Sequence, residues 1–404
     1  MSVAIEFQSV DILFCARQGR EGRKAVRDAL ALLDSGDSRA EIAEKLGVIV
    51  GVAGASLSVA RGDISVLMGL SGSGKSTLLR AANGLNRIAR GAVLVHEGDA
   101  AIDVASCDAP QLRRLRRERI AMVFQQFGLL PWRTVRDNVG FGLELRGEAP
   151  AARRRIVEEK LELVGLAQWA DRYVAELSGG MQQRVGLARA FATDADILLM
   201  DEPFSALDPL IRGKLQDELL ELQARVRKTI LFVSHDMDET LRLGDRITIL
   251  QNGRIVQTGT AEDIVLEPAD EYVAEFVRHM NPLDVLTGAM IMRERGRFGG
   301  EGGTVQLDAA GRYRLLLDAD DRIVELRADD VPLAVVPVPA DGAMPAGTAG
   351  LPLAPASLSL HEIIRLRQSA GHPVLLGEQG RVIGVCGEQE ILAALAGSRR
   401  SGPP

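Results

Sequence analysis

The chain has 404 residues, of which 46% are apolar and 25% are charged, and its formal net charge is -7. This length allows two or three domains, and the composition is that of a globular protein with a substantial core. The acidic balance argues against a nucleic-acid-binding protein, because such proteins normally carry a basic domain.

Cysteine usage and hydropathy predict a soluble, cytoplasmic protein. Cys15, Cys107 and Cys386 lie far apart, and no Cys/His pair has the spacing of metal ligands, which favours a reducing compartment over a disulfide scaffold. Glu6 and Asp11 interrupt the N-terminus, so it does not resemble a signal peptide. No window holds eighteen uninterrupted apolar residues, so we expect no transmembrane helix, although the protein could dock on a membrane partner.

Residues 21–47 form an unusual segment between the first predicted strand and an apolar run that leads to a glycine-rich loop. Ser38 lies three residues before Glu41, which is the spacing of a capping box, so we expect two short helices joined by a turn at 34–37. The sequence AEIAEKLGV resembles the first helix and turn of a DNA-binding helix-turn-helix. The residues that follow, IVGVAGASLSV, carry no side chain that reads base edges or binds phosphate, so we expect no nucleic-acid partner.

Short apolar runs flanked by Gly or Asp predict buried parallel strands. These runs lie at 64–68, 197–200 and 230–233. Helical patterns alternate with them, at 76–85, 182–192 and 210–225. The alternation predicts an α/β sheet with crossover helices. Asn252-Gly253, between two β-rich segments, predicts a hairpin with a type I′ turn.

The composition of the sequence changes after Pro282, where we place a domain boundary. A glycine-rich segment at 296–303 precedes short strand-like runs. Residues 331–360 contain six of the sixteen prolines and are typical of a linker or loop. Residues 372–396 are typical of strand, turn, strand and helix. We therefore expect two domains, 1–282 and 283–404.

The strongest chemical signal is the sequence GLSGSGKST, which follows a predicted strand and precedes a helix. It matches the pattern G-x4-G-K-[ST], in which backbone N–H groups cradle phosphates, the lysine reaches the β- and γ-phosphate oxygens and the hydroxyl ligates Mg²⁺. A glycine-rich turn that binds nothing is the alternative, and the strand–loop–helix context disfavours it. The candidate nucleotide-binding residues are Gly69, Ser71, Gly72, Ser73, Gly74, Lys75, Ser76 and Thr77.

Polar residues at the ends of other buried strands supply the remaining chemistry. In ILLMDEP, Asp201 would hold Mg²⁺ through water, and Glu202 can orient or deprotonate the attacking water. His235 ends a third strand, in LFVSHD, and is a candidate donor to the γ-phosphate, with an ordinary strand-end polar residue as the alternative. Gln125 ends the strand-like run MVFQQF, and its side chain could contact metal or water.

A second phosphate cradle is indicated by ELSGGMQQRVGLARA, residues 176–190. Ser178, Gly179 and Gly180 stand directly before a helix-forming run, where free backbone N–H groups and the positive end of the helix dipole attract an anion. This cradle lies far along the chain from the first one, and a single nucleotide site has no need of both.

Together these motifs, in their order and spacing, resemble those of an ABC-transporter ATPase subunit over residues 1 to about 280. The resemblance implies a P-loop NTPase fold of the ABC type, with a RecA-like core, an antiparallel β subdomain and a helical subdomain within about residues 86–190. It implies ATP and Mg²⁺ as cofactors. The implied motifs are Walker A at 69–77, the Q-loop at Gln125, the signature at 177–181, Walker B at 201–202, the D-loop at 205–208 and the H-loop at His235.

The resemblance also assigns roles to individual residues. The implied catalytic residues are Lys75, Gln125, Glu202 and His235. The implied metal ligands are Ser76, Gln125 and Asp201. Asp208 and the signature residues Ser178, Gly179 and Gly180 would contact nucleotide. Because Ser178 and Gly180 would grip the γ-phosphate on the Walker A loop of the other protomer, the resemblance implies a head-to-tail homodimer.

Members of this family usually stack the adenine on an aromatic residue near the N-terminus. Phe14 is the candidate in this sequence, and an ordinary packed phenylalanine is the alternative.

The insert at 21–47 and the sequences VAGASLSVARGDISVLMGLSGSGKSTLLRAANGL and SALDPLIRGKLQDELLELQ narrow the resemblance to the ATPases of glycine betaine/proline/choline importers. It implies uptake of a quaternary-ammonium compatible solute through an integral membrane permease, with an extracytoplasmic solute-binding protein as an indirect partner. The ATPase would be peripheral, on the cytoplasmic face of the inner (plasma) membrane. An importer for another solute, such as an amino acid, and a non-transport ABC ATPase are the alternatives.

These ATPases commonly carry a C-terminal pair of CBS modules. Residues 357–397 resemble one CBS unit, whereas 283–340 match the first unit poorly. We therefore expect a small α+β C-terminal domain that is either CBS-like and regulatory or purely structural or dimerising.

Two further segments have open interpretations. Residues 113–119, RRLRRER, could face anionic lipid or a partner, or form a solvated helix face. Residues 127–139 form an aromatic-apolar cluster after the Q-loop, in a region that lines the permease groove in the family. Trp132 is either an anchor in that groove or a core residue.

Overall fold

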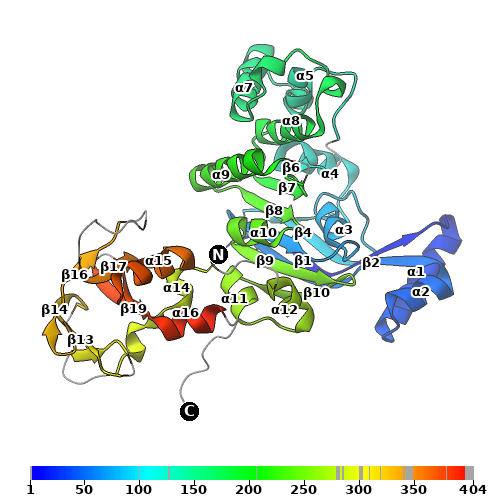
Figure 1. The fold of residues 1–404 in the computed structure, drawn as a ribbon. Helices are drawn as coiled ribbons and strands as arrows, with labels where there is room; N and C mark the ends of the chain where they lie inside the picture. The colour runs from blue at the N-terminus through cyan, green and yellow to red at the C-terminus, as the bar shows by residue number, and fades with distance from the viewer. Residues whose placement is uncertain are drawn as a thin grey trace. The chain divides into compact units, whose positions relative to one another are not determined.

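The computed structural model describes residues 2–98, 100–125, 128–205, 207–278, 283, 286–299, 304–308, 310–318, 320–339, 342, 349–378 and 380–395. The chain divides into two compact units, residues 1–260 and 261–404, and each is described by itself. Figure 1 shows the helices and strands of both units. The domain boundary predicted at Pro282 lies outside the described residues and stays a prediction.

The centre of the first unit is a six-stranded sheet in the order β10-β9-β3-β8-β7-β6. All of its strands are parallel except β10, which pairs antiparallel with β9 at the edge. The strands are β3 (Ile64–Met68), β6 (Ile120–Val123), β7 (Ile197–Asp201), β8 (Thr229–Val233), β9 (Arg246–Gln251) and β10 (Arg254–Gly259). Every residue of β3, β7 and β8 is buried, because helices cover a parallel sheet on both faces.

The predicted strands at 64–68, 197–200 and 230–233 are therefore confirmed. The predicted hairpin is confirmed as well, since β9 and β10 flank Asn252 and Gly253, whose φ angles of 48° and 77° are both positive, as a type I′ turn requires.

A second, antiparallel sheet has the order β2-β1-β4-β5. Its strands are β1 (Val3–Cys15), β2 (Val48–Ala60), β4 (Arg90–Glu97) and β5 (Ala100–Asp103). The helix α3 (Lys75–Ala81) contacts both sheets, and it ends four residues before the predicted 76–85 helix does. Apolar residues from the two sheets and α3 share one core, so the glycine-rich loop before α3 is held between them.

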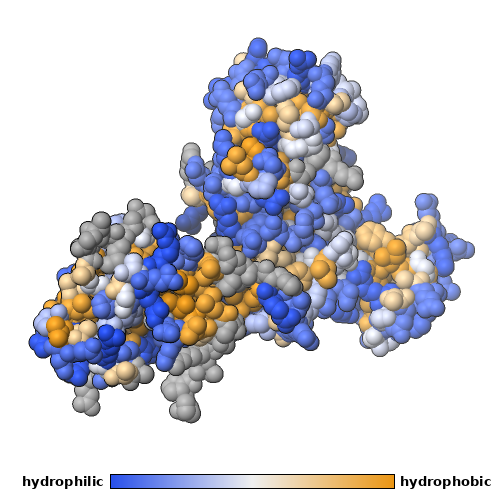
Figure 2. Space-filling view, viewed as in Figure 1, coloured by the Kyte–Doolittle hydropathy of each residue, from blue (hydrophilic) through white to orange (hydrophobic). Residues whose placement is uncertain are grey.

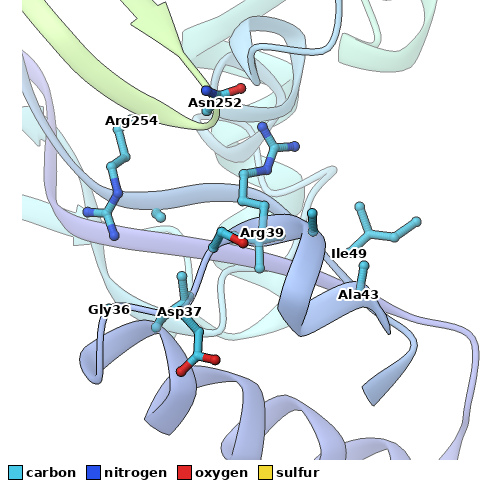
Figure 3. Close-up of a pocket in the computed structure, with 12 residues that line it drawn as sticks. Gly36, Asp37, Arg39, Ala43, Ile49, Asn252 and Arg254 are labelled. Carbon is cyan, nitrogen blue, oxygen red and sulfur yellow. The ribbon is translucent and has the colours of Figure 1, made fainter. Parts of the chain in front are cut away.

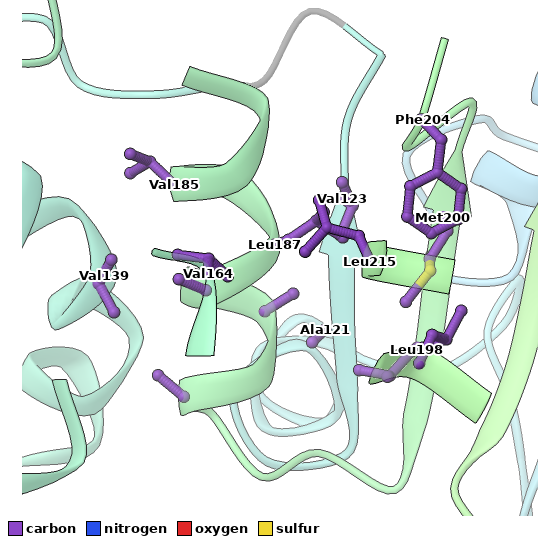
Figure 4. Packing of buried hydrophobic residues seen from close by; sticks show 14 of the residues in the cluster. Ala121, Val123, Val139, Val164, Val185, Leu187, Leu198, Met200, Phe204 and Leu215 are labelled. Atoms are coloured by element: carbon purple, nitrogen blue, oxygen red, sulfur yellow. The ribbon is translucent and has the colours of Figure 1, made fainter. Parts of the chain in front are cut away.

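Helices form a separate layer against the β6 side of the central sheet. They are α5 (Val135–Val139), α6 (Phe141–Arg146), α7 (Pro150–Leu163) and α8 (Gly179–Ala192). Figure 4 shows Val185 and Leu187 of α8 among the residues of a core that also takes Val123 from β6 and Met200 from β7. This shared core fixes α8 relative to the strand ends that carry the polar residues described below. Later in the chain, α9 (Pro209–Val226) precedes β8 and α10 (Met237–Leu243) follows it.

The insert consists of α1 (Gly19–Asp34) and α2 (Arg39–Leu46), which confirms the two predicted helices. Ser38 Oγ accepts the Glu41 N–H, and the Glu41 carboxylate accepts the Ser38 N–H, so the predicted capping box is present. Ala25, Ala29 and Leu33 recur every four residues along α1, and this face packs on Val48 and Val50 of β2. Hydrophobic residues are nevertheless visible on the surface of the insert (Figure 2).

The second unit contains a five-stranded sheet, β11-β19-β18-β17-β16, and a four-stranded sheet, β12-β13-β14-β15. The first sheet is mixed, with β16, β17 and β18 parallel and β19 and β11 antiparallel. The described helices of the second unit are α11 (Ala261–Leu266), α12 (Glu271–Arg278), α14 (Gly288–Ile291), α15 (Leu360–Ala370) and α16 (Glu388–Leu395). Its strands are β11 (Arg293–Glu294), β12 (Thr304–Gln306), β13 (Tyr313–Leu317), β14 (Ile323–Ala328), β15 (Val331–Pro332), β16 (Val335–Pro337), β17 (Leu351–Pro355), β18 (Val374–Glu378) and β19 (Arg381–Cys386).

The strand, turn, strand and helix expected at 372–396 are confirmed as β18, β19 and α16. The expectation of a linker over 331–360 is wrong for the strands β15, β16 and β17. Leu351 N donates to Ala334 O at 2.9 Å, and Leu353 O accepts the N–H of Val338 at 2.8 Å. Because these residues alternate with prolines, the missing proline N–H groups fall at positions that these bonds do not use.

Candidate nucleotide site

The glycine-rich loop between β3 and α3 has room only for glycine at two of its corners. Gly69 and Gly74 have φ angles of 143° and 105°. A Cβ atom on Gly69 would lie 2.2 Å from Leu250 O, and one on Gly74 would lie 2.6 Å from Gly51 O. The backbone of the loop is therefore pressed against its neighbours, and its shape depends on positive φ angles that other residues rarely adopt.

Two buried polar side chains make the interior of this loop suited to phosphate. Lys75 is only 6% exposed, and its Nζ donates to Gly69 O at 2.7 Å and to Leu70 O at 3.0 Å. Burial lowers the pKa of Lys75, opposed by the charges of Glu202 and Asp201. Ser73 Oγ is buried without a hydrogen-bond partner in the described chain. A phosphate would satisfy both groups, because its oxygens accept hydrogen bonds and its charge offsets the buried ammonium.

The metal-ligand candidates Ser76 and Asp201 are brought together. Ser76 Oγ donates to Asp201 Oδ1 at 2.7 Å, and Asp201 is fully buried at the end of β7. Hydroxyl and carboxylate oxygens are ligands that Mg²⁺ takes beside phosphate oxygens, so these two residues fit such an ion.

Arg80 is a member of the site that the sequence analysis missed. Its Nε and Nη2 donate to Asp201 Oδ2 at 3.1 and 2.8 Å. Arg80 follows Ser76 by four residues on α3, so the two side chains share one helix face. That spacing is a signal for Arg80, but its partner becomes known only once β7 is placed beside α3.

Two of the predicted catalytic residues, Gln125 and His235, converge on the carboxylate of a third, Glu202. Gln125 Nε2 donates to Glu202 Oε2 at 3.2 Å, and His235 Nδ1 lies 3.5 Å from the same oxygen. The three residues follow β6, β7 and β8, which are neighbours in the sheet. A carboxylate between an amide and an imidazole can accept a proton from water that the other two groups orient.

The backbone at Glu202 is held in an uncommon conformation. Its φ angle is 49°, and its N–H donates to Val233 O at 3.1 Å. Its carbonyl oxygen accepts the amide of Gln183, a residue of α8, at 3.2 Å. Strain of this kind is common where a side chain must be aimed at a reacting group.

The segment around His235 is held by polar contacts of buried and half-buried side chains. Ser234 Oγ donates to Glu239 Oε2 at 2.5 Å, and Gln216 Nε2 donates to Glu239 Oε1 at 2.9 Å. Arg212 Nη1 donates to Asp236 Oδ2 at 3.2 Å, and its Nη2 donates to Leu207 O at 3.3 Å. Leu207 and Asp236 are thus tied through one guanidinium, a link with no signal in the sequence.

Comparison with known proteins agrees with this geometry. The ABC transporter family matches residues 52–205. The glycine betaine/proline betaine transport system ATP-binding protein ProV of Salmonella typhimurium is 51% identical over 265 residues, which are 66% of this chain and 65% of that protein. The glycine betaine transport ATP-binding protein OpuAA of Bacillus subtilis is 40% identical over 408 residues, which cover 98% of this chain and 93% of that protein. The chain belongs to the ABC-transporter ATPase family, and both of these relatives are ATP-binding proteins of glycine betaine transport.

A solved structure supports the same assignment. A dimeric ATP-binding cassette in a post-hydrolysis state, bound to ADP and Pi, is 28% identical, with a TM-score of 0.53, and the match covers 64% of this chain and 98% of that one. The predicted ABC-type ATPase fold, in a family that uses ATP with Mg²⁺, is therefore confirmed. The described helices include none that is long and apolar enough to cross a membrane.

In this ABC ATPase the signature and the Walker A loop belong to different layers. Ser178 caps α8, and its Oγ accepts the Met181 N–H at 3.4 Å. Figure 1 shows α8 beside α5 and α7, whereas α3 lies against the strands of the central sheet. Gly179 and Gly180 form the first turn of α8. The contact of these residues with nucleotide stays a prediction.

Phe14, the candidate for stacking the adenine, lies near the Walker A loop, and its stacking role stays a prediction. A Cβ atom on Gly51 would lie 2.8 Å from Phe14 Cε2 and 3.0 Å from Thr77 Cγ2, so the ring lies close to the end of the Walker A sequence. The insert therefore does not separate Phe14 from the loop in space. Phe14 is 42% exposed, which leaves part of the ring available for stacking.

The structure also describes Asp208, Trp132 and the basic segment 113–119. Asp208 caps α9, with its carboxylate accepting the Ile211 N–H at 3.1 Å. Trp132 is 71% exposed, so the core-packing alternative is wrong because its ring lies at the surface. Phe127, at the start of the same cluster, lies outside the described residues. Of the basic segment 113–119, Leu115 alone is buried and most of the arginines are exposed, as a solvated face would be.

Proposed function

We propose that this chain is the ATP-binding and ATP-hydrolysing subunit of an ABC importer that takes up a quaternary-ammonium compatible solute, such as choline or glycine betaine, or proline. The observation that carries the proposal is the convergence of Gln125 and His235 on the carboxylate of Glu202. This group lies next to Asp201, which is bonded to Ser76 of the Walker A helix.

The proposed division of labour follows from these contacts. The Walker A backbone and Lys75 bind and neutralise the phosphates, and Ser76 and Asp201 hold Mg²⁺, which offsets phosphate charge when bound. Glu202 accepts the proton of the attacking water, and Gln125 and His235 orient that water and the phosphate. The contacts of Ser234 with Glu239 and of Arg212 with Asp236 keep the His235 segment in place while this happens.

We further propose that two copies act as a head-to-tail dimer. Each signature helix start, with Ser178 and Gly180, would meet the nucleotide bound on the Walker A loop of the partner subunit, with Asp208 near the same interface. The dimeric state of the solved cassette with ADP and Pi supports this arrangement.

The transport partners are part of the same proposal. The dimer would lie against the cytoplasmic face of the inner membrane, bound to an integral membrane permease and served indirectly by an extracytoplasmic solute-binding protein. The choice of solute rests on the likeness to OpuAA, which extends over 98% of this chain. The exposed Trp132 is the proposed anchor for the permease.

The C-terminal unit is proposed to be regulatory and CBS-like over residues 357–397. Support comes from its element order, in which α15 connects the parallel strands β17 and β18, and the hairpin β18–β19 is followed by α16. A structural or dimerising role is the alternative.

Two measurements test the proposal. Glu202→Gln should abolish hydrolysis and trap an ATP-bound dimer, and a variant that keeps full hydrolysis and forms no dimer would contradict the mechanism. Cells lacking this subunit should lose uptake of choline, glycine betaine or proline, most visibly at high osmolarity. Unchanged uptake of all three would leave the ATPase mechanism in place and overturn the solute class, in favour of an importer for another solute such as an amino acid.

A further inference from the structure

The helical insert is fixed firmly to the antiparallel sheet, whose strand β2 lies against the Walker A loop. Its helices share a small core with Val48 and Val50 of β2. Arg90 of β4 adds a polar tie, because its Nε donates to the buried Asp11 at 2.6 Å and its Nη1 and Nη2 donate to Asp34, the last residue of α1, at 2.8 and 2.9 Å. The insert therefore holds its side chains at defined places near the loop.

One of these side chains reaches the Walker A loop. Arg39, the first residue of α2, donates from Nη1 to Gly72 O at 3.4 Å. The side chain lines a pocket of about 590 Å³ between the insert, β2 and the β9–β10 turn. Figure 3 shows Arg39 extending from α2 toward the turn that carries Asn252, with Arg254 on another wall of the pocket.

The guanidinium of Arg39 has no carboxylate partner among the described residues. Asp37, which also lines the pocket, is paired with Lys45, and Glu41 is occupied by the capping box of α2. Arg39 is half-buried, and burial lowers its pKa, yet an arginine keeps its charge in proteins. A partly desolvated cation without a counter-ion costs free energy that a neighbouring anion would offset.

We propose that Arg39 is an additional nucleotide-binding residue, which contacts the phosphate chain of ATP held on the Walker A loop of its own protomer. The inference rests on the proposed function, because that function brings the anion to the loop. The insert thereby becomes part of the nucleotide site and adds to the positive charge that Lys75 supplies from within the loop. A charge-assisted hydrogen bond to phosphate is the contact for which a guanidinium is suited.

The test compares nucleotide binding by the full chain and its variants. AMP-PNP with Mg²⁺ is titrated into wild type, Arg39→Ala, Arg39→Lys and Arg27→Ala, where Arg27 is an exposed arginine of α1 that does not line the pocket. We expect Arg39→Ala to weaken binding about three- to tenfold, Arg39→Lys to restore part of the loss, and Arg27→Ala to bind like wild type. The loss should shrink as salt is raised, because screening weakens an exposed charge contact.

The outcomes separate this inference from the proposed function. If wild type binds and Arg39→Ala binds equally well, Arg39 is not a nucleotide ligand, while the ATPase proposal stands. An equal loss in Arg27→Ala would overturn the inference too, since the effect would then come from net charge alone. Failure of wild type to bind the nucleotide would instead contradict the proposed function. If Arg39→Ala unfolds thermally at the same temperature as wild type, the variant is folded. If it is not folded, the comparison of Arg39→Lys with wild type takes its place.

Discussion

At the scale of single residues, Gly74 and Gly72 differ in one respect that can be tested. Both have positive φ angles, 105° and 77°, so alanine is strained at either position by about 1–2 kcal/mol. A Cβ on Gly74 would also lie 2.6 Å from Gly51 O, whereas none of the described atoms outside the immediate chain neighbours lies within 4 Å of a Cβ on Gly72. We predict that Gly74→Ala lowers both nucleotide affinity and stability more than Gly72→Ala, as measured by AMP-PNP titration and urea unfolding. Equal effects would mean that the loop can move away from Gly51.

The burial of Glu239 leads to a prediction about how the free energy of unfolding depends on pH. Burial raises its pKa above the usual 4.5, opposed by the hydrogen bonds from Ser234 and Gln216, while the charge of Asp236 raises it further and that of Arg212 lowers it. Between 4.5 and the raised value, the folded protein holds a proton that the unfolded chain has lost. The contribution of Glu239 to the free energy of unfolding therefore falls as pH rises through that window.

Glu239→Gln removes this titration and keeps the shape of the side chain. We predict that its free energy of unfolding declines less than that of wild type as the pH rises above 4.5. Glu218 is the comparison, since burial raises its pKa as well but it lies on α9 and not on α10, and Glu218→Gln tests whether any partly buried carboxyl behaves alike. Parallel pH curves for wild type and Glu239→Gln would contradict the prediction.

At the scale of elements, Arg90 is the link between the insert and the antiparallel sheet. Its two partners differ in burial, because Asp11 is 1% exposed, whereas the side chain of Asp34 is 58% exposed. Arg90→Ala leaves the Asp11 carboxylate buried, with the Gly54 N–H at 2.7 Å as its remaining donor among the described residues, so we expect a loss of about 1–3 kcal/mol in stability. Asp34→Ala should cost little, because water replaces the lost contact. Chemical denaturation of both variants measures the difference, and a larger loss for Asp34→Ala would contradict it.

Elements whose signal is local were predictable from the sequence. The runs that became β3, β7 and β8 are almost entirely apolar, because both faces of that sheet are covered. The Ser38–Glu41 capping box marks the start of α2 for a reason confined to four residues. The signal failed over 331–360, where proline content suggested a linker. There β15 pairs with the neighbouring strand β14, whereas β16 and β17 pair with residues sixteen or more positions away in the chain.

The residues of the site likewise divide into those that a local sequence signal predicts and those that depend on distant partners. Asp201, Glu202, Gln125 and His235 could be found because each follows an apolar strand, and the sheet then brings strand ends together. Arg80 and Arg39 could not be assigned in this way. Their partners, Asp201 and Gly72, lie on other elements, and neither arginine stands in a pattern that names its partner.

At the scale of the whole molecule, the separation of the signature from the Walker A loop leads to the last prediction. Ser178 lies at the start of α8 in the helical layer, while Lys75 starts α3 against the sheet. In the proposed dimer the Ser178 hydroxyl meets nucleotide bound to the partner subunit. Ser178→Arg adds a long side chain at that contact, so we predict that it prevents dimer closure. Binding of ATP to the single subunit should be unchanged, because the Walker A loop is intact.

The experiment uses Glu202→Gln as the background, since that variant should accumulate as an ATP-bound dimer. Light scattering with ATP and Mg²⁺ should report a dimer for Glu202→Gln alone and a monomer for the Ser178→Arg double variant. Ser178→Thr is the matched control, because threonine keeps a hydroxyl and still caps a helix, and its double variant should remain dimeric. If Ser178→Arg instead abolished ATP binding at concentrations where the protein is monomeric, the signature would serve its own nucleotide. The head-to-tail arrangement would then be wrong.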